Sequence, residues 1–173
     1  LRLGNNDLEL AYVVAVLNAE SMQRLECLDL SQCEGMEDYA MWERARPHPN
    51  LRHLSLEGVD APGELLEALS QCALAPGLEV LDLSDTRVHE GHVDLLTTGR
   101  FEQLVTLVLN DNEVTIDDIT QLCDSDALPN LAAIYVVGNR LEEIEWQLKD
   151  AREEGACEGV AVHWYGDVMY QAA

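Results

Sequence analysis

The sequence predicts an α/β solenoid, with a parallel sheet on its concave face and helices on its convex face. Two observations support this fold class. The pattern L-x-x-L-x-L recurs along the chain, and the anchor residues of its copies are spaced 26 or 27 positions apart. The stretches between the copies carry apolar residues at the three-to-four spacing of an amphipathic helix. A fixed period of this length is typical of solenoids, whose stacked units share one continuous core.

Seven copies of the pattern are in phase. Their anchor residues are Leu1, Leu28, Leu54, Leu81, Leu107, Ile134 and Val160. Within a copy, two leucines two residues apart, such as Leu28 and Leu30, turn one face of a strand toward the core. Between copies, Gly63–Cys72 and Ile116–Cys123 are clear helical segments. A proline two residues before a copy, as at Pro49, ends the preceding segment and favours an extended chain.

The repeat resembles that of the leucine-rich-repeat proteins over essentially the whole chain. In that family Asn or Cys follows three positions after the last leucine of the pattern. Asn6, Cys33, Asn112 and Asn139 match this feature, and Val59 and Thr86 depart from it. The period is similar to that of the ribonuclease-inhibitor-like branch, which implies a horseshoe with a full helix in each repeat. The resemblance also implies a ladder of Asn and Cys hydrogen bonds, interrupted in the middle, and a structural role for Cys33.

The two ends of the chain differ in character. Residues 1–159 are expected to form the solenoid, with a truncated first repeat, and residues 160–173 the aberrant last strand and a C-terminal cap or tail. The last helix is expected at Leu141–Glu154. Because residue 1 falls inside a strand with no capping helix before it, we expect the natural protein to extend further, or a partner to cover this edge.

The chain is strongly acidic. It has 33 Asp and Glu against 10 Lys and Arg, a formal net charge of −23. Such a charge repels nucleic-acid phosphates and anionic membranes, so we expect neither as a partner. It favours a protein partner with a basic patch. Solubility, salt adaptation or codon bias are alternative origins of the acidity.

The five cysteines are odd in number and scattered, without a C-x-x-C pair. They predict no disulfide framework, no zinc site and a reducing compartment. The longest apolar run, Leu10–Leu17, is too short to span a bilayer, and no segment resembles a signal peptide. The sequence therefore predicts a cytoplasmic location.

The motifs of enzymes are missing from the sequence. It contains no nucleophile elbow, phosphate loop, dinucleotide turn or metal-ligand spacing, so we expect neither catalysis nor a metal or cofactor. His89 and His92 are expected at an exposed helix start, and Asp117 and Asp118 at the positive end of a helix dipole. Trp42 and Trp146 are expected to pack against the core.

Residues that alternate with the core leucines point outward, and those of neighbouring strands stack about 4.8 Å apart in columns. Two columns, one with Arg52 between Glu26 and Glu79 and one with Asp60 beside Arg87, are expected to be satisfied by cross-strand ion pairs.

The other columns have an acidic middle and an apolar, aromatic C-terminal third. The acidic residues are Asp29, Glu57, Asp82, Asp85 and Asp111, and the apolar and aromatic ones are Val108, Tyr135, Val137 and Trp164. At a spacing of 26, Ala161 stands beside Tyr135 and Trp164 beside Gly138. We predict that these nine residues bind a partner. The alternative is that residues 167–173 cover Tyr135 and Trp164.

The sequence therefore predicts a protein–protein interaction module that binds its partner on the concave face. A first alternative is a regulator that acts on an enzyme in trans, as in GTPase-activating proteins with similar repeats; it rests on fold analogy. A second is an architectural or substrate-recognition part of a larger protein. The sequence does not specify the partner or the oligomeric state.

Overall fold

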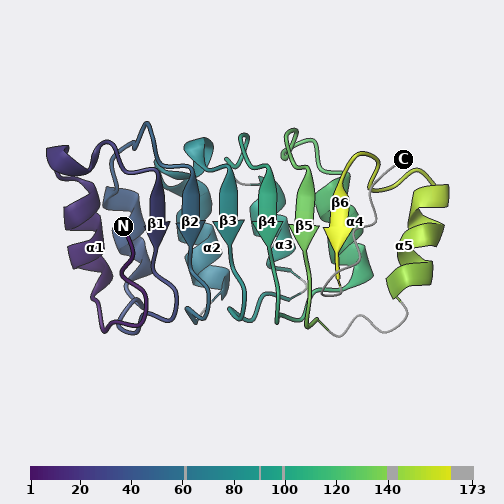
Figure 1. The fold of residues 1–173 in the computed structure, drawn as a ribbon, viewed down its shortest axis with the longest axis horizontal. Coiled ribbons are helices and arrows are strands. Elements are labelled where there is room, and N and C mark those ends of the chain that lie inside the picture. Colours follow the sequence, from purple (N-terminus) through teal and green to yellow (C-terminus); the bar gives the residue numbers. More distant parts are fainter. Residues whose placement is uncertain (61, 90, 99, 140–143, 165–173) are drawn as a thin grey trace.

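The computed structural model describes residues 1–60, 62–89, 91–98, 100–139 and 144–164. In this part of the chain six parallel strands form one sheet in sequential order, with the helices on one side of it (Figure 1). The strands are β1 (Cys27–Asp29), β2 (His53–Ser55), β3 (Val80–Asp82), β4 (Thr106–Val108), β5 (Ala133–Tyr135) and β6 (Ala161–His163). The α-helices are α1 (Leu10–Leu17), α2 (Pro62–Gln71), α3 (Val93–Thr98), α4 (Ile116–Cys123) and α5 (Ile144–Glu153). The 3₁₀ helices are η1 (Glu20–Met22), η2 (Tyr39–Arg44) and η3 (Ala75–Gly77). The α/β solenoid is confirmed, and its horseshoe curvature stays a prediction.

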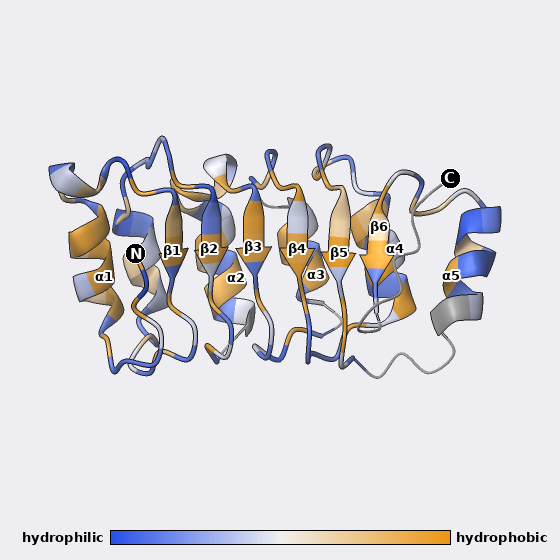
Figure 2. Ribbon diagram, viewed as in Figure 1, coloured by the Kyte–Doolittle hydropathy of each residue, from blue (hydrophilic) through white to orange (hydrophobic). Residues whose placement is uncertain are grey.

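The strands form where alternating apolar residues meet the core. One buried residue lies at the centre of each strand, and none of these is more than 1% exposed: Leu28, Leu54, Leu81, Leu107, Ile134 and Val162. The parallel register sets each beside the next. A second buried column follows two residues later: Leu30, Leu56, Leu83, Leu109 and Val136. Figure 2 shows this apolar character along the sheet. Burial of one such side chain contributes about 2 kcal/mol, so the two columns dominate the stability of the sheet.

The first copy of the repeat extends the sheet beyond β1. Arg2 forms an isolated parallel bridge with Asp29, in the predicted register. The backbone N–H groups of Leu3 and Asn5 donate to the carbonyls of Asp29 and Ser31, both at 2.8 Å. The opening residues therefore continue the ladder, as predicted.

The last copy departs from the predicted register. Ile134 pairs with Val162, and Tyr135 with His163. The prediction that Val160 is the anchor is wrong by two residues, because the repeat from Ile134 to Val162 is 28 residues long (162 − 134) where a spacing of 26 was expected. Trp164 consequently follows Val162 in the inward column of Val136, and it packs half-buried against the core.

The helices agree with the sequence in most units. Helices α2 and α4 lie within one residue of the predicted segments. The helix α4 begins with a capping box, in which Thr115 Oγ1 accepts from the N–H of Asp118 and Asp118 Oδ2 accepts from the N–H of Thr115. Between β1 and β2, however, the helical side of the sheet carries the 3₁₀ helix η2 in place of the α-helix expected in every repeat.

The two tryptophans differ in their surroundings. Trp42 on η2 is fully buried, as predicted. Trp146 on α5 is 53% exposed, so it is only half covered and is not a core residue. The start of the predicted last helix, at residues 141–143, lies outside the described part of the chain.

The Asn and Cys ladder is present and is interrupted where the sequence indicates. Asn112 accepts from the N–H groups of Thr86 and Val88 and donates to the carbonyls of Leu83 and Asn110, at 2.8–3.2 Å. Asn139 bonds in the same way to the Val114 N–H and to the Leu109 and Val136 carbonyls. The thiol of buried Cys33 donates to the Leu3 carbonyl at 3.2 Å. At the interrupted positions Val59 is apolar, and Thr86 Oγ1 bonds within its own repeat to the Leu83 carbonyl.

His48 is a polar residue in an apolar column. It is 5% exposed, and neither ring nitrogen has a hydrogen-bond partner among the described residues. It lies three residues before Leu51, a place that neighbouring repeats fill with buried apolar residues: Ala75, Phe101 and Leu128. His48→Leu is therefore expected to raise the free energy of unfolding by about 1 kcal/mol, because it removes an unsatisfied buried polar group.

Urea denaturation measures the effect of His48→Leu. The matched control is His53→Leu, at an exposed position on β2, which is expected to change stability little. A loss of stability in His48→Leu would show that the imidazole makes a favourable polar interaction.

Candidate interaction surface

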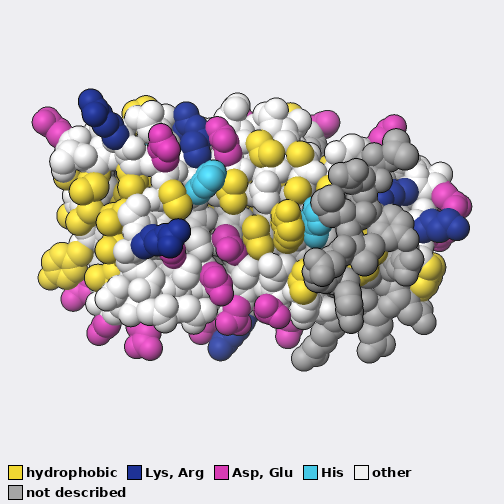
Figure 3. All heavy atoms as spheres, viewed as in Figure 1, with side chains coloured by type: hydrophobic (Ala, Val, Ile, Leu, Met, Phe, Trp, Pro, Cys, Tyr) yellow, Lys and Arg dark blue, Asp and Glu magenta, His cyan; other side chains and the backbone are white. Residues whose placement is uncertain are grey.

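The face of the sheet turned away from the helices, here called the open face, carries most of the predicted binding residues (Figure 3). Its central column crosses all six strands: Asp29, Ser55, Asp82, Val108, Tyr135 and His163. In Figure 3 acidic side chains gather over β2 and β3, and apolar ones over β4 and β5. The open face therefore divides into an acidic and an apolar region.

Two aspartates of the acidic region are held by the same local contact. Oδ1 of Asp29 accepts from the N–H of Ser31 at 3.0 Å and from its hydroxyl at 2.6 Å. Oδ1 of Asp82 accepts from the same groups of Ser84 at 3.0 and 2.7 Å. The bonds from Ser31 lower the pKa of Asp29. The motif Asp-Leu-Ser thus fixes a carboxylate on β1 and on β3.

Glu57 lies after β2, between these two strands, and its pKa is raised. Burial is the main cause, followed by the four aspartates of the acidic region. Within the described chain none of these five acids forms an ion pair. The five predicted acidic residues therefore share one acidic environment. Arg2 and the N-terminal ammonium offset part of its charge at Asp29, where both lower the pKa.

Asp85 and Asp111 belong to a column whose backbone is left-handed. In the first six copies, which the structure describes at this position, the φ angles run from 52° to 78° at Asn5, Gln32, Gly58, Asp85, Asp111 and Gly138. Asn, Asp and Gly tolerate this conformation best, which accounts for most of the residue types in the column. From the sequence we considered only the charges in this column and did not predict its left-handed backbone, although the recurring Asn, Asp and Gly indicate that conformation.

The apolar region is built around Tyr135 on β5. Its ring stacks on that of His163 from β6, with centroids 4.2 Å apart and planes 6° from parallel. Val108 on β4 and Val137 after β5 both lie half-buried near Tyr135. The sequence reading missed His163 because its register placed Ala161 beside Tyr135. Trp164, predicted to join this region beside Gly138, lies instead in the inward column.

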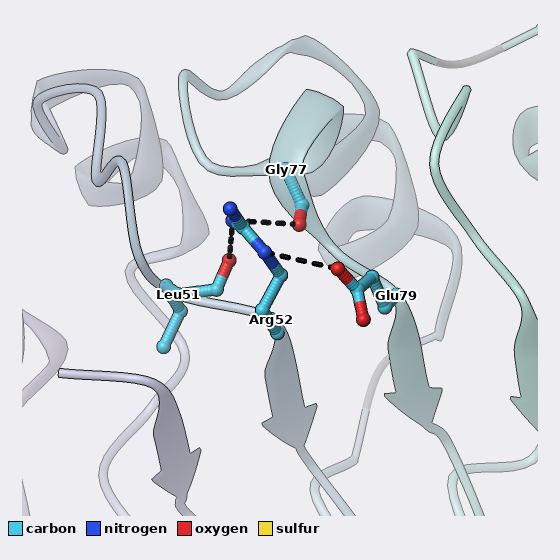
Figure 4. Close-up of polar contacts among 4 residues, drawn as sticks. All are labelled: Leu51, Arg52, Gly77 and Glu79. Carbon is cyan, nitrogen blue, oxygen red and sulfur yellow. Dashed lines mark hydrogen bonds and ion pairs between the residues drawn. The ribbon is translucent and has the colours of Figure 1, made fainter.

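Cross-strand ion pairs flank the acidic and apolar regions, as predicted. Nε of Arg52 lies 3.0 Å from a carboxylate oxygen of Glu79, and Nη1 donates to the carbonyls of Leu51 and Gly77 (Figure 4). On the opposite rim Arg87 pairs with Asp60 at 3.2 Å. These two arginines are engaged by acids outside the acidic region and do not neutralise it.

The histidine pair lies immediately before α3, as expected. The rings of His89 and His92 are 3.9 Å apart, and Nδ1 of His92 accepts from the His89 N–H at 3.3 Å. Burial, followed by the neighbouring His89, lowers the pKa of His92. Among the described residues no group of three or more His, Cys, Asp or Glu could hold a metal ion.

The cysteines depart from the prediction. Cys123 and Cys157 form a disulfide that the sequence did not predict, although a single bond is not the disulfide framework that the scattered cysteines excluded. The remaining thiols are Cys27, which is exposed, and Cys33 and Cys72, which are buried.

The fold is that of a leucine-rich-repeat solenoid, a class in which parallel strands line one face and helices the other. The crystal structure of an internalin from Listeria monocytogenes str. 4b F2365 is similar, with a TM-score of 0.59 and 15% sequence identity. The match covers 95% of this chain and 40% of the internalin chain, so this chain spans less than half the length of the internalin. No protein-family model and no curated protein matches the sequence. None of the described helices is long and apolar enough to cross a membrane.

Proposed function

We propose that the chain is a protein-interaction module that binds its partner on the open face. The observation that carries the proposal is the division of one surface into unpaired carboxylates and an aromatic patch. Clustered like charges are costly unless water, a cation or a base from a partner lies among them, and partly exposed aromatic residues such as Tyr135 are common in binding hot spots. The leucine-rich-repeat fold supports this function because it presents its sheet as a continuous surface.

The arrangement favours a partner with a basic group beside an apolar one. Asp82 and Tyr135 stand in one column on β3 and β5. Since neighbouring strands are about 4.8 Å apart, the two side chains are about 10 Å apart along the sheet. A partner with Lys or Arg at that distance from an aliphatic or aromatic side chain meets both regions. Asp29, Glu57, Asp85 and Asp111 extend the acidic contact, and Val108 and Val137 extend the apolar one. We propose that the protein meets such a partner in the cytoplasm.

Affinity capture followed by measurement on the purified partner tests this proposal. Tyr135→Ala is expected to weaken binding at least about tenfold, as at a hot spot. Asp82→Asn is expected to weaken binding and reduce its salt dependence, because the amide oxygen still accepts from Ser84 but the charge is lost.

The matched controls lie away from the open face. Tyr12→Ala on α1 removes a tyrosine that is 64% exposed, and Glu43→Gln on η2 removes one negative charge. Both are expected to bind like the wild type. The proposal fails if Tyr135→Ala and Asp82→Asn, folded normally, still bind every partner of the wild type with unchanged affinity.

A further inference from the structure

Cys157 occupies a backbone position that normally favours glycine. It lies in a turn whose residues Gly155, Cys157 and Gly159 have φ angles of 96°, 55° and 83°. A side chain with a Cβ is disfavoured in this left-handed conformation. Cys157 is nevertheless there, 1% exposed, and its N–H donates to Oδ1 of Asp124 at 2.9 Å. The left-handed backbone therefore does not explain why a cysteine stands at this position. The bond that its thiol forms does.

The disulfide connects the C-terminal unit to the repeat before it. Cys123 is the last residue of α4, and Cys157 lies between α5 and β6, 34 residues further along the chain. The two Cα atoms are 4.7 Å apart, within the range that a disulfide spans. The other attachments are the three-residue pairing of β6 with β5, the same length as the other strand pairs, and the buried side chains of Leu148 and Val162.

We propose that the Cys123–Cys157 pair is a reversible redox clasp, oxidised by small disulfides such as glutathione disulfide, that holds β6 against β5. Because β6 carries His163, the clasp also holds the aromatic stack on Tyr135 at the end of the open face. In the reduced state the C-terminal unit opens more often than the rest of the solenoid. A cross-link stabilises a folded region because it limits the conformations of the opened chain. The loop between Cys123 and Cys157 is long enough for this effect to be substantial.

The chemistry is a pair of thiol–disulfide exchanges. The thiolate of Cys123, the more exposed partner, attacks one sulfur of glutathione disulfide and releases one glutathione thiolate. The thiolate of Cys157 then attacks the Cys123 sulfur of the mixed disulfide and releases the second. The protein loses two thiol protons and two electrons, and glutathione disulfide is reduced to two glutathione molecules.

Hydrogen exchange of the full chain, equilibrated with reduced or oxidised glutathione, tests the clasp. The Cys27→Ser background removes the exposed thiol that would also react. The informative amides are those of Ala161, which donates to Ala132, and Val136, which donates to His163. On reduction their exchange is expected to accelerate at least about thirtyfold, the factor for the low end of a disulfide's usual contribution.

Internal controls and a second variant keep the test decisive. The amides of Leu56 and Leu83 bond across β2, β3 and β4 and are expected to change less than about threefold. Adding Cys123→Ser and Cys157→Ser is expected to give the fast exchange in both buffers. Equal exchange in the two states, equal acceleration along the whole sheet, or failure of oxidised glutathione to remove two thiols would overturn the proposal. These readouts are independent of what the open face binds.

Discussion

Asn112→Ala is expected to lower the free energy of unfolding by about 3 kcal/mol, because it leaves several buried backbone groups without a partner. Asn112 is 5% exposed, and its amide serves four backbone groups of two adjacent repeats. The alanine side chain replaces none of these bonds, and the surrounding carbonyls and N–H groups stay buried. Urea denaturation followed by circular dichroism measures the loss.

Asn6→Ala is the matched control for Asn112. Asn6 occupies the same place in the first copy, but it is exposed and its side-chain amide donates to the carbonyls of Leu3 and Gly4 in its own copy. Water can replace these bonds, so the expected loss is below about 1 kcal/mol. Equal effects at the two positions would contradict a ladder that depends on burial.

Gly138→Ala is expected to destabilise the protein by about 3 kcal/mol, through the sum of an unfavourable backbone conformation and a steric overlap. Gly138 has φ of 78°, and a Cβ there would overlap Oδ1 of Asp111 on the neighbouring repeat. The carboxylate would have to move, and with it the acidic region next to β5. Thermal and urea unfolding measure the effect.

Gly91→Ala separates the two contributions. Gly91 has φ of 89°, but a Cβ there meets no atom within 4 Å, so the backbone term alone of about 1 kcal/mol is expected. Adding Asp111→Ala to Gly138→Ala is expected to recover the steric part. If Gly138→Ala costs no more than Gly91→Ala, the contact with Asp111 is not a constraint.

The sequence was sufficient for the fold and for the columns through β5. The recurring leucines determine which residues face the core, and the register follows because each repeat stacks on the last. The failure at β6 has a physical cause. Val160 and Val162 are both apolar and two residues apart, so a slip of two keeps the same face inward and leaves the pattern intact. The slip misplaced Trp164 and concealed the Tyr135–His163 stack.

The candidate surface was only partly predictable. The five acids come together because they lie in adjacent columns, and this needed only the register. The serine bonds to Asp29 and Asp82 depend on rotamers that the pattern does not specify. The Cys123–Cys157 bond joins residues 34 positions apart, which no column relates. The recurring Asn, Asp and Gly residues indicate the left-handed backbone of the column of Asp85 and Asp111, but only the charges of that column were considered.

The gap in the ladder leaves two joints between neighbouring repeats without an Asn or Cys side-chain bond. Cys33 bonds to the first copy, and Asn112 and Asn139 each bond to the copy before. Within the described chain, the side chains of Val59 and Thr86 make no bond to the copy before. The unit around β2 is joined to its neighbours instead by backbone bonds, by apolar packing, by the buried Tyr39 hydroxyl that donates to the Asp60 carbonyl, and by the Arg52–Glu79 and Arg87–Asp60 ion pairs. In a stack whose stability is a sum of neighbour terms, exposed ion pairs thus contribute to cohesion at the joint between β2 and β3, where the ladder has no side-chain bond.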